Sequence, residues 1–259
     1  MAGIRVENLT KRFGETVALD DVSFEIHEGE FTVVLGTSGS GKSTLLRCVN
    51  GLTEPTSGTV TIQGDVVTSP RRDVAMVFQQ HNIIGGMSAY ANALTGALGR
   101  TKFTTSLLRT HDREEKLQAL DALETVGLLE EAEQRAGRMS GGQQQRVGIA
   151  RALVQNPDII LADEPVASLD PGSAQTVMRY LREAAEERGL TAMISLHQVN
   201  LARQFGERFI GLSDGRVVFD GYRDELTFDV IDDIYGGIDM EQFLSGDDGD
   251  GEETNEAVR

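Results

Sequence analysis

The peptide "GTSGSGKST", residues 36–44, carries the most informative pattern in the chain. It matches G-x-x-x-x-G-K-[ST], with Gly36, Gly41, Lys42 and Ser43 at the defining positions. The apolar run "FTVVL" precedes it and "LLRCV" follows, so we expect a buried strand, a glycine-rich loop and a helix in this order. Glycines let successive backbone N–H groups curl around phosphate oxygens without Cβ clashes, which makes this a phosphate-binding loop.

The loop predicts a site for a nucleotide and Mg²⁺. Lys42 is expected to reach the β- and γ-phosphates, and the Ser43 hydroxyl is expected to ligate Mg²⁺. A dinucleotide-binding loop needs G-x-G-x-x-G, which is a different spacing. The residues that we expect to contact the nucleotide here are Gly36, Thr37, Ser38, Gly39, Ser40, Gly41, Lys42, Ser43 and Thr44.

The peptide "IILADEP", residues 159–165, is an apolar strand that ends in two acids. Two surface acids at a strand end are one interpretation. Downstream of a phosphate-binding loop, the pattern instead predicts that Asp163 holds the Mg²⁺ shell. Glu164 points another way and could polarise an attacking water.

Three further residues have both a structural and a functional interpretation. His197 ends the predicted strand "ISLHQ"; a lone histidine is usually structural, but beside a γ-phosphate its imidazole could hold the phosphate and the water together. Gln79 in "VFQQ" could reach Mg²⁺ or its water, and Gln80 is the less favoured choice. Phe13 in "KRFGE" offers either ordinary hydrophobic packing or a flat face for adenine stacking.

The peptide "RMSGGQQQRVGIARAL", residues 138–153, places serine and glycines before a predicted helix. Serine is a good N-cap, so a polar loop and a capped helix are one interpretation. The other is that the exposed N–H groups of Ser140, Gly141, Gly142 and Gln143 receive an anion. The second glutamine pair, residues 144–145, is expected on the helix surface.

Strand-like and helical runs alternate along the rest of the chain, which argues for an α/β fold. Residues 4–35 suggest antiparallel strands, with "VSFEI" and "FTVVL" joined by the turn "HEGE". "ERFIGLSDGRVVFDG" predicts a hairpin that turns at Asp214–Gly215. Residues from about 87 to 137 are expected to form a helical insertion, because Leu117, Leu120 and Leu123 follow helical spacing.

The chain of 259 residues has a net charge of −17, and residues 224–259 account for −12 of it, with thirteen acids and one base. Its end, "SGDDGDGEETNEAVR", has no periodicity and is expected to be disordered. No basic stripe is visible, which disfavours nucleic-acid binding. No apolar run approaches the ~18 residues of a membrane span, and the single cysteine, Cys48, is expected to be a buried thiol.

Taken together, these motifs resemble the ATP-binding cassette subunits of membrane transporters over residues 3–225. "GTSGSGKST" looks like the Walker A motif, and "IILADE" looks like Walker B. "MSGGQ" is similar to the signature motif, and "SLD" is similar to the D-loop, which contains Asp170. Gln79 matches the Q-loop glutamine and His197 the switch histidine. The signature usually starts with leucine, and Met139 is similar in volume. The resemblance implies ATP and Mg²⁺ as cofactors. It implies that Glu164 and His197 are catalytic and that the metal is bound by Ser43, Gln79 and Asp163.

The resemblance also implies partners. Ser140, Gly141 and Gly142 cannot all serve the ATP held by the loop of their own chain. The resemblance implies that they cap the γ-phosphate bound by a second copy, which gives an ATP-dependent homodimer. Two transmembrane permease subunits, and indirectly an extracellular solute-binding protein, are implied, with the chain peripheral on the cytoplasmic face of the membrane. The implied fold is a P-loop, RecA-like core with an antiparallel β subdomain and a helical subdomain at about 87–144; residues 226–259 form an acidic extension.

A finer match, in "LADEPVASLDP", "SLHQVNLARQF", "GRVVFDG" and "IDDIYGG", looks like the phosphonate-importer branch. The chain departs from that branch at "IIGGMSAYANAL" and shortly after it, where Gly85, Gly86 and Ala97 are unexpected. We therefore expect an ATPase subunit of an importer for phosphonates or related oxyanions. The alternatives are another solute, such as phosphate, phosphite or an amino acid, and a cassette ATPase outside transport. A GTP-binding switch is rejected, since an N-K-x-D-like guanine reader is lacking.

Overall fold

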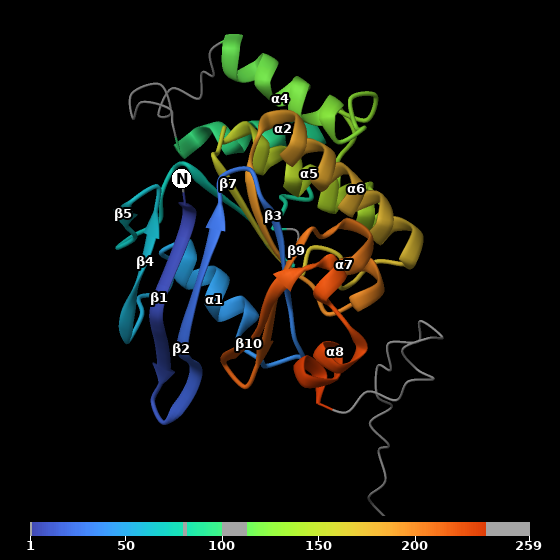
Figure 1. The fold of residues 1–259 in the computed structure, drawn as a ribbon. Helices are drawn as coiled ribbons and strands as arrows, with labels where there is room; N and C mark the ends of the chain where they lie inside the picture. Colours follow the sequence, from blue (N-terminus) through green and yellow to red (C-terminus); the bar gives the residue numbers. More distant parts are fainter. Residues whose placement is uncertain (1, 80–81, 100–112, 237–259) are drawn as a thin grey trace, which may run out of the picture.

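The computed structural model describes residues 2–79, 82–99 and 113–236. In this part the strands form two sheets (Figure 1). The smaller, antiparallel sheet has the order β2–β1–β4–β5 and consists of β1 (Ala2–Phe13), β2 (Thr16–His27), β4 (Ser57–Ile62) and β5 (Asp65–Val66). The larger sheet has the order β10–β9–β3–β8–β7–β6 and consists of β3 (Phe31–Leu35), β6 (Val74–Val77), β7 (Ile159–Asp163), β8 (Thr191–Ser195), β9 (Arg208–Ser213) and β10 (Arg216–Tyr222).

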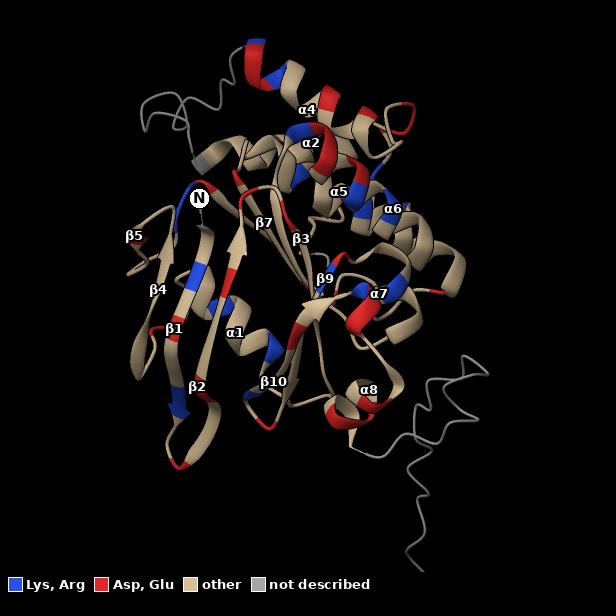
Figure 2. Ribbon diagram, in the orientation of Figure 1, with Lys and Arg blue, Asp and Glu red and all other residues tan. Residues whose placement is uncertain are grey.

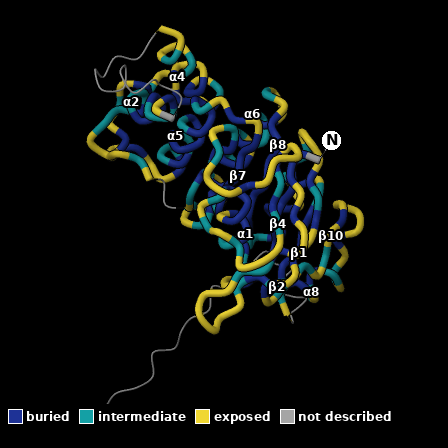
Figure 3. Tube along the Cα trace, turned by 90° about the vertical axis from the view of Figure 1, so that its left-hand side faces the viewer, coloured by how far each residue is buried: buried dark blue, intermediate teal, exposed yellow. Residues whose placement is uncertain are grey.

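The larger sheet separates two hydrophobic clusters. Along β3, Val33 and Leu35 face one cluster and Val34 faces the other, because successive side chains of a strand point to opposite faces. Helix α1 (Lys42–Val49) packs between the larger sheet and the antiparallel sheet, and Cys48 is buried there. The dark central strands of Figure 3 show how deeply both sheet faces are covered.

The other face of the larger sheet carries most of the helices. They are α2 (Ala89–Leu94), η1 (Thr95–Gly99), α4 (Arg113–Thr125), η2 (Ala136–Arg138), α5 (Gly141–Val154), α6 (Pro171–Arg188), α7 (Val199–Phe205), η3 (Arg223–Glu225) and α8 (Phe228–Tyr235). Helices α2, α4 and α5 pack against one another. On α4 the buried stripe is Ala119, Ala122 and Leu123, whereas Leu117 and Leu120 are exposed. No helix in the described residues is long and apolar enough to span a membrane.

One predicted pairing is wrong. The turn "HEGE" does not make a hairpin of β2 and β3, because β3 leaves the antiparallel sheet and pairs in parallel with β8 and β9. All five residues of β3 are buried, which suits a central strand covered on both faces. The hairpin at Asp214–Gly215 is confirmed: both residues have positive φ, as a type I′ turn requires, and β9 and β10 pair across it.

Two segments that lie far apart in the sequence are joined backbone to backbone. Residues 85–90 bond to residues 132–137 through Gly137 N to Gly85 O at 3.0 Å, Ala136 N to Met87 O at 2.9 Å and Tyr90 N to Ala132 O at 2.9 Å. A Cβ on Gly137 would lie 2.9 Å from Gly85 O, so this close approach needs glycine. We call this pair of segments the backbone strap.

Helix α8 begins the acidic extension, and the sequence pattern did not predict it. Ile231 and Ile234 are buried against the larger sheet, while Asp229 and Asp233 are exposed, as the acidic bands on α8 in Figure 2 show. The end of the chain that is expected to be disordered lies outside the described residues.

Candidate functional site

The phosphate-binding loop joins β3 to α1, as predicted. Gly41 adopts φ 107°, and a Cβ there would lie 2.6 Å from Ala18 O. A Cβ on Gly36 would collide with the Leu212 carbonyl oxygen and the Ser40 hydroxyl. The loop therefore packs tightly between the antiparallel sheet and β9, and its Gly36 and Gly41 positions leave no space for a side chain.

Lys42 is buried in the loop. Its ammonium donates to Gly36 O at 2.7 Å and Thr37 O at 2.9 Å, and lies 3.5 Å from a Glu164 carboxylate oxygen. Burial lowers the pKa of Lys42, and Glu164 opposes that shift. The buried Ser40 hydroxyl oxygen has no hydrogen-bond partner among the described residues. A buried ammonium beside an unsatisfied hydroxyl fits an anion such as a triphosphate.

Asp163 forms the centre of a hydroxyl cluster at the end of β7. Its Oδ1 accepts from Ser43 Oγ at 2.8 Å and from Ser195 Oγ at 3.0 Å. The structure therefore brings together the hydroxyl and the carboxylate that the sequence assigned to Mg²⁺, and this all-oxygen donor set is what Mg²⁺ prefers. Sequence reasoning missed Ser195, although a serine that closes the apolar strand β8 was a usable signal.

Glu164 is held in a strained backbone conformation. Its φ is 45°, in the left-handed region, and its backbone N–H donates to Ser195 Oγ at 2.9 Å. A non-glycine residue in this region costs about 1–3 kcal/mol and persists where surrounding contacts hold it. The consequence is that Glu164 turns its carboxylate toward Lys42, whereas Asp163 turns toward Ser43.

Gln79 and His197 end up at the same edge of the larger sheet. Strands β6, β7 and β8 are parallel neighbours, so the residues that follow them meet at their carboxyl ends. Gln79 follows β6 and is exposed; His197 follows β8 and is half-buried, and its backbone carbonyl accepts from Tyr235 Oη at 2.8 Å.

Phe13 lies at the end of β1, paired with Thr16. Its side chain is 53% exposed, and Lys11 Nζ lies 4.9 Å from the ring centroid. The ring therefore lies on the same hairpin that places Ala18 against Gly41, and adenine stacking on it stays a prediction.

The signature residues form a second, separate surface. Ser140 caps α5: its hydroxyl accepts from Gln143 N at 3.3 Å, and its N–H donates to Gln143 Oε1 at 3.0 Å. Asp170 caps α6 in the same way and accepts from Ser173 N at 3.0 Å, and hydrogen bonds from Ser173 hold the pKa of Asp170 below its ordinary value. A hollow of about 340 Å³ is lined by Ser140, Gly142, Gln143, Arg146, Asp170, Gly172, Ser173, Thr176 and Val177.

No residue of the phosphate-binding loop lines this hollow. The structure groups Asp170 with Ser140, Gly142 and Gln143, apart from Lys42, Ser43 and Asp163. Gly142 packs closely against α6, since a Cβ there would lie 3.1 Å from Ser173 Cβ. Met139, in the place of the usual leucine, is buried in the core.

The prediction that Gln144 and Gln145 lie on the helix surface is wrong. Gln145 is fully buried, and its amide donates to Phe78 O at 3.5 Å. Gln144 is half-buried and donates to Ala136 O and Met139 O, each at 3.1 Å. Both amides are thus engaged by backbone carbonyls rather than by solvent.

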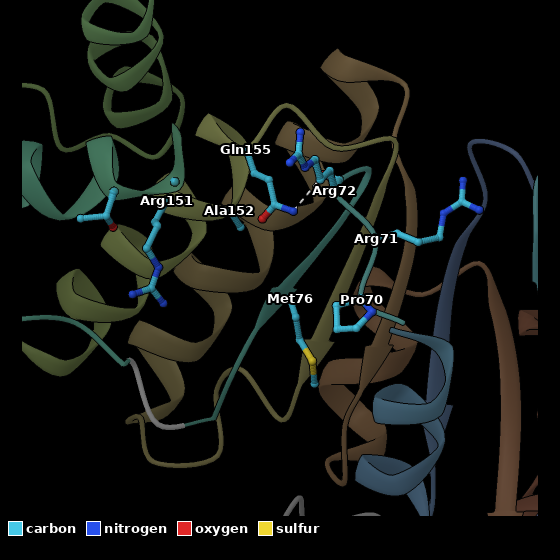
Figure 4. Close-up of a pocket in the computed structure, with 9 residues that line it drawn as sticks. Pro70, Arg71, Arg72, Met76, Arg151, Ala152 and Gln155 are labelled. Atoms are coloured by element: carbon cyan, nitrogen blue, oxygen red, sulfur yellow. Dashed lines mark hydrogen bonds between the residues drawn. The ribbon is translucent and has the colours of Figure 1, made fainter. Parts of the chain in front are cut away.

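Another hollow, of about 390 Å³, lies beside β6 and the end of α5 (Figure 4). Three arginines line it, but their guanidinium groups point in different directions, and Arg71 is engaged by Asp73 at 2.7 Å. Gln155 donates to Arg72 O at 2.9 Å. Since the three cations do not converge, this hollow does not resemble an anion site.

The comparisons with known proteins agree with one another. A family model described as ABC transporter matches residues 19–167. A phosphonates import ATP-binding protein of Halobacterium salinarum is 67% identical over 248 residues, which cover 96% of this chain and 89% of that protein. A protein with the same description in Thiobacillus denitrificans is 49% identical and covers 91% of this chain and 93% of its own length.

Solved structures give the same result. The ATP-binding cassette MJ0796, in a dimeric post-hydrolysis state with ADP and Pi, has a TM-score of 0.73 and 37% identity, covering 85% of this chain and 98% of that one. The ATP-binding cassette MJ1267 of an ABC transporter has a TM-score of 0.80 and 27% identity, covering 95% and 98%.

Proposed function

The chain belongs to the ABC transporter family, and from this premise we propose that it is the ATP-hydrolysing subunit of an importer for phosphonates. The observation that carries the proposal is the 67% identity, across 96% of the chain, to a protein described as a phosphonates import ATP-binding protein. The cluster of Lys42, Ser43, Asp163 and Glu164 supplies the chemistry that such a subunit needs.

The loop residues bind the triphosphate. Lys42 exchanges the carbonyls of Gly36 and Thr37 for phosphate oxygens, and the Ser40 hydroxyl gains the acceptor that it lacks. Ser43, Asp163 and Gln79 would hold Mg²⁺, which neutralises charge on the β- and γ-phosphates when it is bound. Phe13 provides the stacking face for adenine.

Glu164 acts as the general base. It takes a proton from the water whose oxygen forms the new bond to the γ-phosphorus, while the bond to the β,γ-bridging oxygen breaks and ADP leaves. His197 holds the γ-phosphate and this water in register. The contact between Glu164 and Lys42 supports the role, because a triphosphate on Lys42 lies within reach of the same carboxylate.

A second copy completes each site. The capped start of α5 and Asp170 lie apart from the loop of their own chain, so we assign Ser140, Gly141, Gly142 and Gln143 to the γ-phosphate held by the partner subunit. The dimeric state of the MJ0796 cassette supports this assembly. Two permease subunits take up the resulting motion, with this chain peripheral on the cytoplasmic face of the membrane.

Uptake of labelled methylphosphonate tests the solute. Cells that lack this chain should lose uptake, and expression of the wild-type chain should restore it. The Glu164→Gln chain, expressed to the same protein level, should not restore uptake. Unlabelled phosphate and phosphite serve as competitors. Uptake that persists without the chain, or that phosphate displaces more effectively than phosphonates, would overturn the assignment.

A further inference from the structure

Helix α8, which opens the acidic extension, reaches the catalytic edge of the larger sheet. We propose that Tyr235 is a positioning residue for His197, an inference that rests on the proposed ATPase function. The phenol of Tyr235 fixes the backbone from which the His197 imidazole extends. The extension would then supply part of the catalytic apparatus, rather than only solvated charge.

The sheet holds α8 in one place. Ile231 and Ile234 are fully buried, and a Cβ on Gly211 in β9 would lie 2.5 Å from both Cδ1 and Cγ1 of Ile234. Glycine at 211 therefore lets the helix approach the strand. Gly211 pairs with Leu35, directly before the phosphate-binding loop, so α8 lies against the end of the sheet at which that loop begins.

Two further bonds join this helix to the segment after β8. Arg203 in α7 donates to Leu226 O at 2.9 Å, which ties α7 to the start of α8. At the other end of α8, Tyr235 Oη donates to His197 O at 2.8 Å, an ordinary length for a neutral O–H donor. Gly236, with φ 75°, ends the helix directly after Tyr235.

His197 has firm support on its other side as well. Leu196 N donates to Val34 O at 3.0 Å, and Ser195 holds Asp163 and Glu164. The backbone from Ser195 to His197 is thus fixed by β3, by the carboxylate cluster and by Tyr235. The Tyr235 bond involves neither β3 nor the carboxylate that bonds to Ser43, so its loss should disturb His197 and leave the loop intact.

Tyr235→Phe tests the proposal because it removes one hydroxyl and keeps the ring. Steady-state ATP hydrolysis by the purified full chain should show kcat lowered by about three- to tenfold, the range for one lost neutral hydrogen bond, with KM for ATP unchanged. Tyr222→Phe is the matched control: its hydroxyl lies 3.4 Å from Glu30 Oε1, and kcat should not change.

A double-mutant cycle separates positioning from general destabilisation. In a His197→Ala background, Tyr235→Phe should change the residual rate by less than about twofold, because the imidazole through which it acts is gone. Equal fold losses in the two backgrounds would overturn the proposal, as would an unchanged kcat in the single variant. A rise in KM for ATP with unchanged kcat would assign Tyr235 to nucleotide binding and would also overturn it.

The same assay distinguishes this inference from the function on which it rests. If the wild-type chain hydrolyses ATP and the Tyr235→Phe chain, assayed separately, has the same kcat, only the role of Tyr235 is refuted. A wild-type chain that hydrolyses no ATP, alone or with its membrane subunits, refutes the proposed function and the inference together.

Discussion

The two halves of the proposed ATP site differ in how their polar groups are held. In the half built on the phosphate-binding loop, the polar groups are buried or half-buried and meet across distant parts of the sequence: Ser43 and Ser195 both bond to Asp163, and Lys42 lies 3.5 Å from a Glu164 carboxylate oxygen. In the half built on Ser140 and Asp170, the side chains are exposed and bond to residues three positions ahead in the same helix.

This difference indicates a division of labour. The first half is a network whose members depend on one another, so the chemistry of hydrolysis belongs there. The second half consists of two capped helix starts beside one hollow, a local arrangement independent of the first network, which we assign to the anion bound by a second copy. Substitutions in the first half should therefore impair the reaction, and those in the second should impair assembly.

The largest effect is expected at Glu164. Glu164→Gln keeps the size and the backbone bond to Ser195 but removes the base, so turnover should fall by about 10²–10⁴ while ATP binding is retained. Phosphate release and equilibrium binding of labelled ATP measure the two properties. If the Glu164→Gln chain hydrolysed ATP at the wild-type rate, the general base would be another residue. The chemistry of hydrolysis could then no longer be assigned to the first half on this ground.

The next effect tests whether the second half acts in trans. Ser140→Arg puts a bulky side chain at the exposed cap and should lower turnover by about a hundredfold, as the loss of positioned anion donors does, while each chain still binds ATP. Lys42→Ala should abolish binding instead.

Mixing these two inactive chains should restore activity, up to about a quarter of the wild-type rate, because half of the randomly formed dimers contain one intact site. If the mixture stays as inactive as either chain alone, while analytical ultracentrifugation shows mixed dimers, the two halves do not share a site across chains.

A smaller effect is expected at Ser195, within the first half. Ser195→Ala removes one donor to Asp163 and leaves the Glu164 N–H without its acceptor, so turnover should fall about tenfold. The Mg²⁺ concentration needed for half-maximal rate should rise with it. Ser213→Ala, at the end of strand β9 on the other side of β3, is the control, and an equal loss in both variants would mean that the Ser195 hydroxyl has no special role.

The smallest effect on turnover is expected when the chain is treated with a maleimide, because its single cysteine, Cys48, lies in α1 but outside the network. Burial raises the pKa of its thiol to about 11, so at pH 8 the reactive thiolate should be roughly a hundredfold rarer than in an exposed cysteine. A maleimide should label Ser140→Cys rapidly and wild-type Cys48 slowly, with turnover of the wild-type chain unchanged. Rapid labelling of Cys48 in the folded chain would show that α1 is not packed as described.

The sequence predicted the parts of this molecule that depend on local pattern. The phosphate-binding loop, the acidic end of β7 and the cap at Ser140 each follow from residue spacing, and the structure places them where the spacing indicated. The pairing of β3 could not be predicted from "HEGE", because a tight turn fits a hairpin and a crossing to another sheet equally well.

The errors arose where long-range contacts decide the outcome. Gln145 is polar and lies in a helix, which suggests exposure, yet its amide donates in the interior to the carbonyl of Phe78, the residue after β6. Ser195 acquires its role only because β7 and β8 are neighbours. Helix α8 is acidic and short, and its packing depends on a distant residue, because Ile234 fits against β9 only where Gly211 has no side chain.

The backbone strap has a mechanical consequence. Segments joined by main-chain hydrogen bonds resist shear, so residues 85–90 and 132–137 should travel as one stiff piece. Because the two segments run antiparallel, with Gly85 opposite Gly137 and Tyr90 opposite Ala132, exposed Ile84 and the signature Ser140 lie beyond the same end of the strap. A displacement of the surface around Ile84 should therefore pass to the segment that leads to Ser140 through the bond between Gly137 N and Gly85 O.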